Sequence, residues 1–451
     1  MAFSVVLVCF EIQKLTALTI EVSTDRSLFF MLHKSNKMFT CSARMSGLLK
    51  NCAYNLATIR HLNVLGIETS CDDTGIALVN EQGDVLGNVL NSQQKFHTRY
   101  GGIIPPRAQD LHRAKIVEIF ERCMKEAKMS PSQLDAIGVT TRPGLPLSLL
   151  VGTRFAKHIA RKYNKPLVPV HHMEAHALQA RMEQNIPYPF LCLLISGGHS
   201  QLVYVRSAIQ FALLGESIDD APGEAFDKIA RRLRLHLLPK YQHWNGGQAV
   251  EDAAKSAQNP AAFEFPLPLA RERNCNFSFA GIKNNSFRNI RSAEGREAGT
   301  PPDGIIRNYH DFCSGLLAAV SRHLMNRTQR ALEYTLSWFG EGPRSLVVSG
   351  GVANNDYIFN DLAHLAEHYD FKTYRPSKKY CSDNGVMIAW NAVEQIAENP
   401  SCLRWDYDAV HIRGKAKLGE CMLDAVAQAK IKCKWVQASK WRARAGVQVM
   451  Q

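Results

Sequence analysis

The fold is decided by residues 64–79, which read VLGIETSCDDTGIALV. Two apolar runs of strand length flank a polar turn, residues 70–75, so this segment predicts two strands joined by a short connection. The same order recurs in residues 190–205, where the apolar runs Phe190–Ile195 and Leu202–Val205 flank a Ser-Gly-Gly-His-Ser turn. One strand-turn-strand unit therefore opens each half of the chain. This repetition predicts a duplicated, two-lobed architecture with the ligand in the cleft between the lobes.

Between these units, predicted strands alternate with predicted helices. Apolar spacing predicts helices over residues 110–128 and 147–163, the second with Pro146 where a first-turn proline is tolerated. Short apolar runs predict strands at residues 136–140 and 166–170. Strands that alternate with helices are typical of an α/β fold whose strands are largely parallel.

Turns of small or polar residues follow three of the predicted strands. The strand Ser345–Val348 runs into Ser349-Gly350-Gly351, in the same position after a strand as the turns at 70–75 and 196–200. Backbone amides in such turns can point at an anion. The turns together predict phosphate-binding positions, although a single Ser-Gly-Gly sequence is common in ordinary loops.

The composition fits a globular protein with a basic balance. The chain has 451 residues, 46% of them hydrophobic and 21% charged, and a formal net charge of +13. This length allows two lobes with a core each, and no apolar run approaches the length that spans a membrane. The charge favours a polyanionic partner, RNA first, although organellar proteins are often basic without binding nucleic acid. The 12 cysteines form no CxxC pair, which argues against a zinc ribbon or a disulfide framework.

The N-terminal region reads as a targeting segment. We expect residues 1–63 to be a mitochondrial targeting region, because residues 38–64 contain Arg44, Lys50 and Arg60 but no acidic residue. A secretory signal is the competing interpretation, but no basic segment precedes its apolar run. We expect the mature chain to begin between Arg44 and Asn63.

The folded part is expected to comprise an N-terminal lobe, residues 64–185, and a C-terminal lobe, residues 186–400, that carries the nucleotide-binding turns. Residues 401–451 form a basic C-terminal tail. Such a tail can neutralise RNA phosphates and stack aromatic rings on bases; the alternative is a tail without a specific role. Beyond Ala427 its basic and aromatic residues are Lys430, Lys432, Lys434, Trp435, Lys440, Trp441, Arg442 and Arg444.

His172 and His176 are the strongest candidates for a metal pair. Residues i and i+4 of a helix lie on one face, so both imidazoles can reach one ion. Asp383, in the downstream turn Ser382-Asp383-Asn384-Gly385, would complete a two-histidine, one-carboxylate set with open coordination positions. The alternative is a helix with one solvated and one core histidine. The pair lacks the glutamate of the HExxH protease motif.

A series of short motifs in one order carries a resemblance to a known family. The motifs are Gly66-Ile67-Glu68-Thr69-Ser70-Cys71-Asp72, Tyr100-Gly101-Gly102, Pro143-Gly144-Leu145, His172-Met173-Glu174-Ala175-His176, Ser196-Gly197-Gly198-His199, Gly223-Glu224-Ala225-Phe226-Asp227-Lys228, Phe277-Ser278-Phe279-Ala280-Gly281, Gly350-Gly351-Val352 and Ser382-Asp383-Asn384-Gly385. With these motifs, the chain resembles over residues 64–394 the tRNA N6-adenosine threonylcarbamoyltransferases, formerly called the O-sialoglycoprotein endopeptidase or glycoprotease family. Its mitochondrial branch is the most similar, given the predicted presequence.

The resemblance implies a two-lobed fold of the actin and hexokinase type (ASKHA) and a transferase activity. A threonylcarbamoyl group would pass from threonylcarbamoyl-AMP to N6 of adenosine 37 in mitochondrial tRNAs that read ANN codons, which forms t6A. The resemblance further implies one divalent metal ion per subunit, zinc or iron, and a separate synthase that supplies the adenylate. We expect a homodimer in the mitochondrial matrix, without membrane contact.

Residue by residue, the resemblance places the metal ligands at His172, His176 and Asp383 and the catalytic carboxylate at Asp72. The archaeal and cytosolic branch has a tyrosine ligand where Leu194 stands, so we expect only three protein ligands. The stretch before the next glycine motif, at Gly246-Gly247, is longer than is usual in the family. The implied substrate-binding residues are Leu194, Ile195, Ser196, Gly197, Gly198, Asp227, Gly247, Glu251, Asn354, Asn355 and Ser382.

The chemistry of these residue types agrees with the implied roles. A carboxylate such as Asp72 can accept the N6 proton, and glycine-turn amides can stabilise a developing oxyanion. Asp227 and Glu251 can accept hydrogen bonds from ribose or adenine. Each residue also has a plainer interpretation: an Asx turn at Asp72, surface charges at Asp227 and Glu251, and a helix cap at Asn355.

Other functions agree with parts of the pattern. An ATP-dependent sugar kinase or ATPase of the same fold would use the turns for ATP, but gives the paired histidines no role. A non-enzymatic RNA-binding scaffold accounts for the charge alone and leaves Asp72 and Asp383 unexplained. A zinc protease lacks its general base.

Overall fold

The computed structural model describes residues 62–100, 102–296, 304–340, 342 and 344–438. It also gives the backbone of four short strands nearer the N-terminus, which form a separate unit. The predicted start of the mature chain, between Arg44 and Asn63, lies almost wholly outside the described residues. The four strands are β1 (Ser4–Val8), β2 (Ala17–Val22), β3 (Leu28–Leu32) and β4 (Met38–Thr40), paired antiparallel in that order.

The first sheet of the main body has the strand order β7-β6-β5-β8-β9. β5 and β6 form the predicted strand-turn-strand unit as an antiparallel pair, and β7 pairs antiparallel with β6. On the other side of β5, strands β8 and β9 run parallel to it. The strands are β5 (Asn63–Glu68), β6 (Asp73–Asn80), β7 (Val85–Ser92), β8 (Ala136–Arg142) and β9 (Leu167–His171).

The second sheet repeats this topology. Read in the same direction, its order is β12-β11-β10-β13-β14, with β15 added outside β12. β10–β11 and β11–β12 are antiparallel, whereas β10–β13 and β13–β14 are parallel. The matching order and direction of five strands confirm the predicted duplication. The strands are β10 (Phe190–Ile195), β11 (Ser200–Ser207), β12 (Gln210–Glu216), β13 (Ser345–Ser349), β14 (Lys372–Tyr374) and β15 (Glu420–Cys421).

The prediction of largely parallel strands is wrong, because each sheet is mixed. The short polar turns connect antiparallel neighbours, since a parallel pair needs a long crossover between its strands. Of the described strands, β8, β9, β13, β14 and β15 pair in parallel with a neighbour, and each is reached through a long connection.

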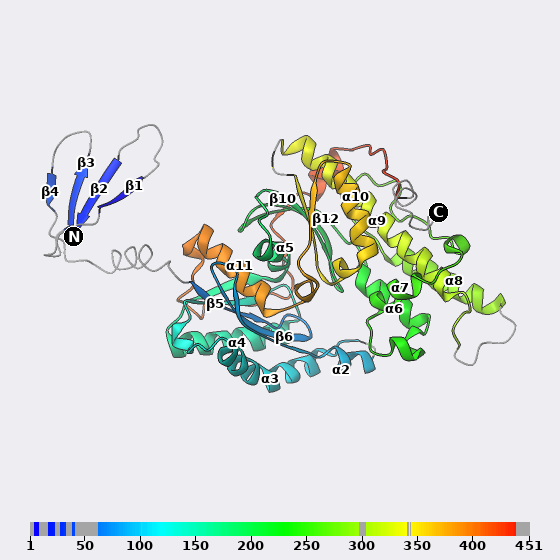
Figure 1. Ribbon diagram of the computed structural model, residues 1–451, viewed down its shortest axis with the longest axis horizontal. Helices are drawn as coiled ribbons and strands as arrows, with labels where there is room; N and C mark the ends of the chain where they lie inside the picture. Colours follow the sequence, from blue (N-terminus) through cyan, green and yellow to red (C-terminus); the bar gives the residue numbers. More distant parts are fainter. Residues whose placement is uncertain are drawn as a thin grey trace. The chain divides into compact units, whose positions relative to one another are not determined.

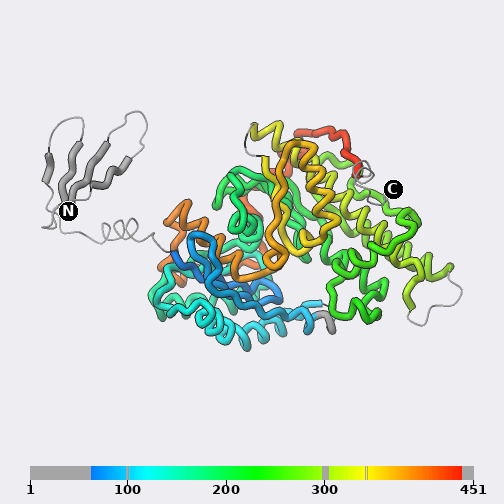
Figure 2. Tube along the Cα trace, viewed as in Figure 1, coloured from blue at the N-terminus to red at the C-terminus, as the bar shows by residue number. Residues whose placement is uncertain are grey.

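Helices cover both faces of the first sheet. α3 (Pro105–Glu126) and α4 (Pro146–Tyr163) lie on one face and α11 (Gly385–Glu398) on the other (Figure 1). Glycines in the strands let α11 approach closely: a Cβ on Gly66 would lie 2.2 Å from the carbonyl oxygen of Gly385. The late segment of the chain, coloured orange in Figure 2, thus lies against the blue strands of the first lobe.

The second sheet is also covered on both faces. Leu191, Leu193 and Ile195 pack into a cluster with the helices α6, α7, α9 and α10, whereas Cys192 and Leu194 pack against α5. α5 also contacts strands of the first sheet, so it lies where the two repeats meet. The helices not yet given are α2 (Gln94–Arg99), α5 (His172–Glu183), α6 (Pro222–Arg232), α7 (Gly246–Ala254), α8 (Ala280–Arg296), α9 (Tyr309–Trp338), α10 (Asp356–Glu367) and α12 (Leu423–Gln428).

Several connections contain single turns of 3-10 helix. Two of them, η2 and η3, lie in the stretch before Gly246. None of the described helices is long and apolar enough to cross a membrane, and the cysteines that the structure describes are unpaired thiols. The turns are η1 (Pro131–Gln133), η2 (Leu235–Leu237), η3 (Pro239–Tyr241), η4 (Pro260–Ala262), η5 (Gly351–Asn354), η6 (Lys378–Tyr380) and η7 (Pro400–Cys402).

The chain beyond α11 contacts both repeats. Arg404 exchanges two backbone hydrogen bonds with Leu167 of β9, at 2.8 and 2.9 Å, and the amide of Arg413 donates to the carbonyl of Thr141 at 2.9 Å. Further on, β15 pairs with β12, and the amide of Val436 donates to Oε1 of Gln329 in α9 at 3.0 Å. Residues 401–438 therefore pack against the folded body.

Candidate metal and substrate site

His172 and His176 lie together at the start of α5, directly after β9. Their ring centroids are 4.7 Å apart with the planes at 87°, as expected for residues one helical turn apart. Both are buried, with 6% and 1% of their surface exposed, which rules out the interpretation with one solvated histidine. The side chain of His171 accepts the amide of Met173 at 3.2 Å and caps the helix.

Asp383 reaches this pair from the loop before α11. Its Oδ1 lies 3.0 Å from Nε2 of His176 and 3.6 Å from Nε2 of His172. One ligand atom from each of the three residues lies within 4.8 Å of the others, an arrangement that could hold a metal ion. Burial opposes ionisation of Asp383, but His172 and His176 hold the pKa of its carboxyl well below the usual range.

The loop that carries Asp383 is fixed by its neighbour Asn384. The side chain of Asn384 accepts the amide of Met387 at 2.9 Å and so caps α11. Its amide group donates to the carbonyls of Ser382, at 2.7 Å, and Tyr380, at 3.2 Å. Asp383 therefore sits at a helix N-terminus, where the helix dipole favours a negative charge.

Glu68 supports His172 from the end of β5. Its Oε2 lies 3.2 Å from Nδ1 of His172 and accepts a 2.5 Å hydrogen bond from the hydroxyl of Thr140, while Oε1 accepts the amide of Ser70 at 2.5 Å. A carboxylate that receives Nδ1–H leaves Nε2 as the free acceptor, the usual way of orienting a histidine ligand. Burial lowers the pKa of His172, yet the carboxylates of Asp383 and Glu68 raise it to about 9.

Asp72 lies on the turn between β5 and β6, beside the histidine group. Burial raises the pKa of the Asp72 carboxyl, and the charge of Asp383 raises it further. The turn is anchored from α3 by the buried His112: its Nδ1 lies 2.7 Å from Oγ1 of Thr74 and its Nε2 lies 3.0 Å from the carbonyl of Cys71. Burial likewise raises the pKa of Asp73 to about 7.

The turn after β10 has an open glycine surface. Oγ of Ser196 accepts the amides of Gly198 and His199 at 3.4 and 3.1 Å, which organises the turn. A Cβ added to Gly197 or Gly198 would meet nothing within 4 Å among the described residues. The side chains of Leu194 and Ile195 are fully buried, so only their backbone can face a substrate.

A second glycine turn lies beside the first. Gly350 has a φ of +99°, and a Cβ on it would lie 2.4 Å from the carbonyl oxygen of Ile195. A side chain is excluded there both by the backbone conformation and by the neighbouring strand. A Cβ on Gly351 would lie 4.0 Å from Oγ of Ser382, so this turn also borders the loop of Asp383.

The remaining predicted substrate residues lie in α6, in α7 and at the start of α10. Oδ1 of Asp227 accepts the amide of Gly246 at 2.6 Å, next to Gly247. Oε1 of Glu251 accepts the amide of Asp356 at 2.8 Å. These bonds tie both carboxylates to the backbone, and Glu251 also hydrogen-bonds the backbone of Tyr357. α6 begins against the first glycine turn, where the amide of Gly223 donates to the carbonyl of Ser196 at 3.2 Å.

The two predicted asparagines differ. Oδ1 of Asn355 accepts the amide of Ile358 at 3.0 Å, so the plainer interpretation as a helix cap accounts for that oxygen. Oδ1 of Asn354 is buried without a hydrogen-bond partner among the described residues. An unsatisfied buried acceptor is costly, so Asn354 is the better candidate for a ligand contact.

The sequence did not single out Glu68, His112 or His199 as site residues. Glu68 had a signal, because an acidic residue ends an otherwise apolar strand. His199 belongs to a quoted motif, and burial followed by the charges of His172 and His176 lowers its pKa to about 4. His112 had no signal, since it lies within an ordinary amphipathic helix.

The fold and the site define a class: two-lobed α/β proteins of duplicated topology, with a candidate two-histidine, one-carboxylate centre where the lobes meet. Residues 84–390 match the tRNA N6-adenosine threonylcarbamoyltransferase family, TsaD. The chain belongs to this family.

Similar curated proteins carry the same name. A "Probable tRNA N6-adenosine threonylcarbamoyltransferase, mitochondrial" of Drosophila melanogaster is 65% identical over 381 residues, which cover 83% of this chain and 93% of that protein. The mitochondrial tRNA N6-adenosine threonylcarbamoyltransferase of Homo sapiens is 40% identical over 374 residues, covering 82% of this chain and 90% of that protein. Among solved structures, T.kodakarensis HypF is similar with a TM-score of 0.49 and 13% identity, covering 75% of this chain and 48% of that one.

Proposed function

We propose that this chain transfers a threonylcarbamoyl group from threonylcarbamoyl-AMP to N6 of adenosine 37 in mitochondrial tRNAs that read ANN codons. The observation that carries the proposal is the meeting of three features: the His172, His176 and Asp383 group, the carboxylate of Asp72, and the open turn at Gly197. The name of its Drosophila relative places that protein in mitochondria, and we assign this chain to the matrix.

The substrate itself is activated, so the chain does not need a strong nucleophile of its own. A carbamoyl adenylate is a mixed anhydride, and the acceptor is an exocyclic aromatic amine. The chain must hold the carbonyl, stabilise negative charge on oxygen and remove one proton. The turn of Ser196, Gly197 and Gly198 offers exposed backbone next to the α6 N-terminus for the oxygens.

Asp72 is suited to remove the proton. Its raised pKa makes it a stronger base than an exposed aspartate, and the turn that carries it is held by His112. Asp227 binds a backbone amide through one oxygen, which leaves the other available to ribose or adenine, and we assign Glu251 to the same part of the substrate. Asn354 is suited to bind the nucleotide through its unpartnered oxygen.

The donor set fits a divalent cation. His172, His176 and Asp383 would hold it, and Glu68 would fix the ring of His172. Two imidazoles and a carboxylate suit zinc or iron. When bound, the ion would supply positive charge next to the carbamoyl and phosphate oxygens. We further propose one ion per subunit, a homodimer, and a separate synthase that supplies the adenylate.

The activity is tested with the purified chain, threonylcarbamoyl-AMP and a transcript of a mitochondrial tRNA that reads an ANN codon. Digested tRNA analysed by mass spectrometry should contain t6A, and a tRNA that lacks A37 serves as the control. Incubation with ATP and a sugar in place of the adenylate examines the kinase alternative. Phosphorylated sugar without t6A in the parallel reaction would replace our proposal with that alternative.

A further inference from the structure

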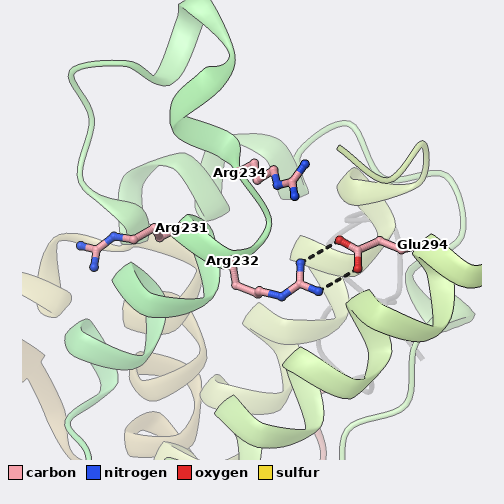
Figure 3. Close-up of a pocket in the computed structure, with 4 residues that line it drawn as sticks. All are labelled: Arg231, Arg232, Arg234 and Glu294. Carbon is pink, nitrogen blue, oxygen red and sulfur yellow. Dashed lines mark hydrogen bonds and ion pairs between the residues drawn. The ribbon is translucent and has the colours of Figure 1, made fainter. Parts of the chain in front are cut away.

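A cavity of about 410 Å³ lies at the end of α6 and is lined by Arg231, Arg232, Arg234 and Glu294. Figure 3 shows Arg232 facing Glu294 of α8, with Arg234 nearby and Arg231 directed to the other side of α6. Both guanidinium Nη atoms of Arg232 lie 2.7 Å from the carboxylate oxygens. This two-bond pair neutralises one arginine and fixes its position. Because three arginines and only one glutamate line the pocket, its lining keeps an excess of positive charge.

The positive charge extends beyond the pocket. From Lys228 to Val250 the chain has no acidic residue. On α8, Arg288, Arg291 and Arg296 add positive charge, whereas Lys283 pairs with Asp220 and Glu294 with Arg232. A basic surface spread over two elements fits an extended polyanion better than a single phosphate group.

The connection between α6 and α7, which begins at the pocket, also carries an exposed aromatic ring. Trp244, between η3 and α7, has 42% of its surface exposed and makes an edge contact with Tyr241 at 5.5 Å. Leu237 in the same connection is 50% exposed. Arginines interspersed with an exposed aromatic side chain are typical of surfaces that bind RNA, because rings can stack on unpaired bases.

The pocket is also close to the proposed substrate residues. Asp227 and Arg231 are four residues apart in α6 and therefore lie on one helical face. The other end of α6 touches the glycine turn at Ser196. With 11 residues, α6 is roughly 16 Å long, so a nucleic acid whose base enters at the turn has phosphates within reach of the arginines.

We propose that the pocket of Arg231, Arg232 and Arg234 is a docking site for backbone phosphates of the tRNA next to the modified nucleotide. This inference rests on the proposed function and names the surface through which that site receives its acceptor. Arg234 binds a phosphate in the pocket, and Arg231 binds a second one on the adjoining side of α6. The pair between Arg232 and Glu294 fixes the wall of the pocket.

The test compares Arg231→Ala/Arg234→Ala with the control Arg113→Ala/Arg122→Ala, which removes the same charge from exposed positions of α3. The pocket variant should raise the KM for tRNA by about tenfold and lower the salt slope of tRNA binding by about two, one for each lost phosphate contact. Its KM for threonylcarbamoyl-AMP should not change. The control should bind tRNA within about twofold of the unchanged chain, since its arginines lie outside the proposed docking surface.

A second variant and a competitor complete the test. Arg231→Lys/Arg234→Lys keeps the charge and should recover most of the salt slope, which loss of local structure would not allow. If the pocket variant binds tRNA as the control does, or if inorganic phosphate binds the pocket without weakening tRNA binding, the docking site is refuted. Absence of t6A with the unchanged chain would instead refute the proposed function, because tRNA binding is measured separately.

Discussion

The turns that follow β5 and β10 occupy the same position in the two repeats, yet their chemistry is opposite. The first carries Asp72 and Asp73, and His112 of α3 contacts the backbone of this turn. The second carries Gly197 and Gly198, has no acidic residue and faces open space. In the proposed reaction, the first turn repels a phosphate and the second accepts it. The duplicated fold would thus give the substrate a direction, with its phosphate in the second lobe and the acceptor amine near the first.

The largest expected effect comes from the candidate metal group of His172, His176 and Asp383. His176→Ala removes one of three ligands from a centre held by both repeats, so bound metal and transfer should each fall by more than about 100-fold. Metal analysis of the purified protein and t6A formation measure this. His364→Ala, on the exposed surface of α10, is the matched control. Full activity of a folded, metal-free His176→Ala protein would contradict a metal role.

Asp72→Asn probes the acidic turn alone. Loss of the base should lower kcat by about 100-fold or more while the KM for the adenylate stays unchanged. In the unchanged chain the rate should fall as pH decreases through the raised pKa of Asp72, above the ordinary value of 3.8, because the base acts in its ionised form. The asparagine variant should lack this acidic limb. An equal limb in both proteins would assign the titration to another group.

The same variant has a consequence for stability. Since the folded-state pKa of Asp72 is raised, the ionised carboxylate destabilises the fold at neutral pH, and that penalty disappears as pH falls through the raised pKa. Asp72→Asn should therefore unfold at the same temperature as the unchanged metal-free protein or higher. A clearly lower Tm would mean that Asp72 stabilises the turn.

Ser196→Ala probes the glycine turn alone. It removes the acceptor of two backbone hydrogen bonds, and at about 1 kcal/mol each the adenylate should bind up to roughly 30-fold more weakly, with kcat less affected. Steady-state kinetics separate the two values. Weakened tRNA binding with an unchanged KM for the adenylate would assign this turn to the other substrate.

The smallest effect on the rate is expected from the C-terminus. Deleting residues 428–451 removes the contact of Val436 with Gln329 and the packing of Ile431, so the free energy of unfolding should fall by about 1–3 kcal/mol. Deleting residues 439–451 leaves these contacts in place, and it examines the predicted RNA role of Lys440, Arg442 and Arg444 by itself. Denaturant unfolding measures the contribution of this segment to stability, and a salt titration of tRNA binding measures its contribution to RNA binding.

Much of the fold was predictable from local pattern. The boundaries of β10 agree with the prediction, and β5, β13 and α4 differ from it by one residue at one or both ends. These elements have uninterrupted apolar runs or clear helical spacing. The direction of a strand does not follow from its own residue pattern, because it depends on which strands become neighbours. It follows from the length of the connection, since two neighbouring strands joined by a short turn can only be antiparallel.

The candidate site was predictable where chemistry is written into short motifs. His172, His176 and Asp383 come together as expected, although Asp383 is more than 200 positions downstream of His176. The roles of the supporting residues were not predictable, because Glu68 and His112 act through long-range contacts with Thr140 and Cys71. Helix periodicity marks His112 only as buried. Its bond to the turn depends on how α3 packs on the sheet.

The position of α11 has a consequence for how the chain is made and delivered. The first sheet is complete by His171, but the helix that covers its inner face starts at Gly385, and Arg404 and Arg413 add further contacts with it. During synthesis or import from the N-terminus, the first lobe emerges with one apolar face bare until nearly all of the chain has followed. Chaperones should therefore bind the first lobe for longer than they bind a lobe of this size that folds by itself. Truncated chains that end before Gly385 should aggregate.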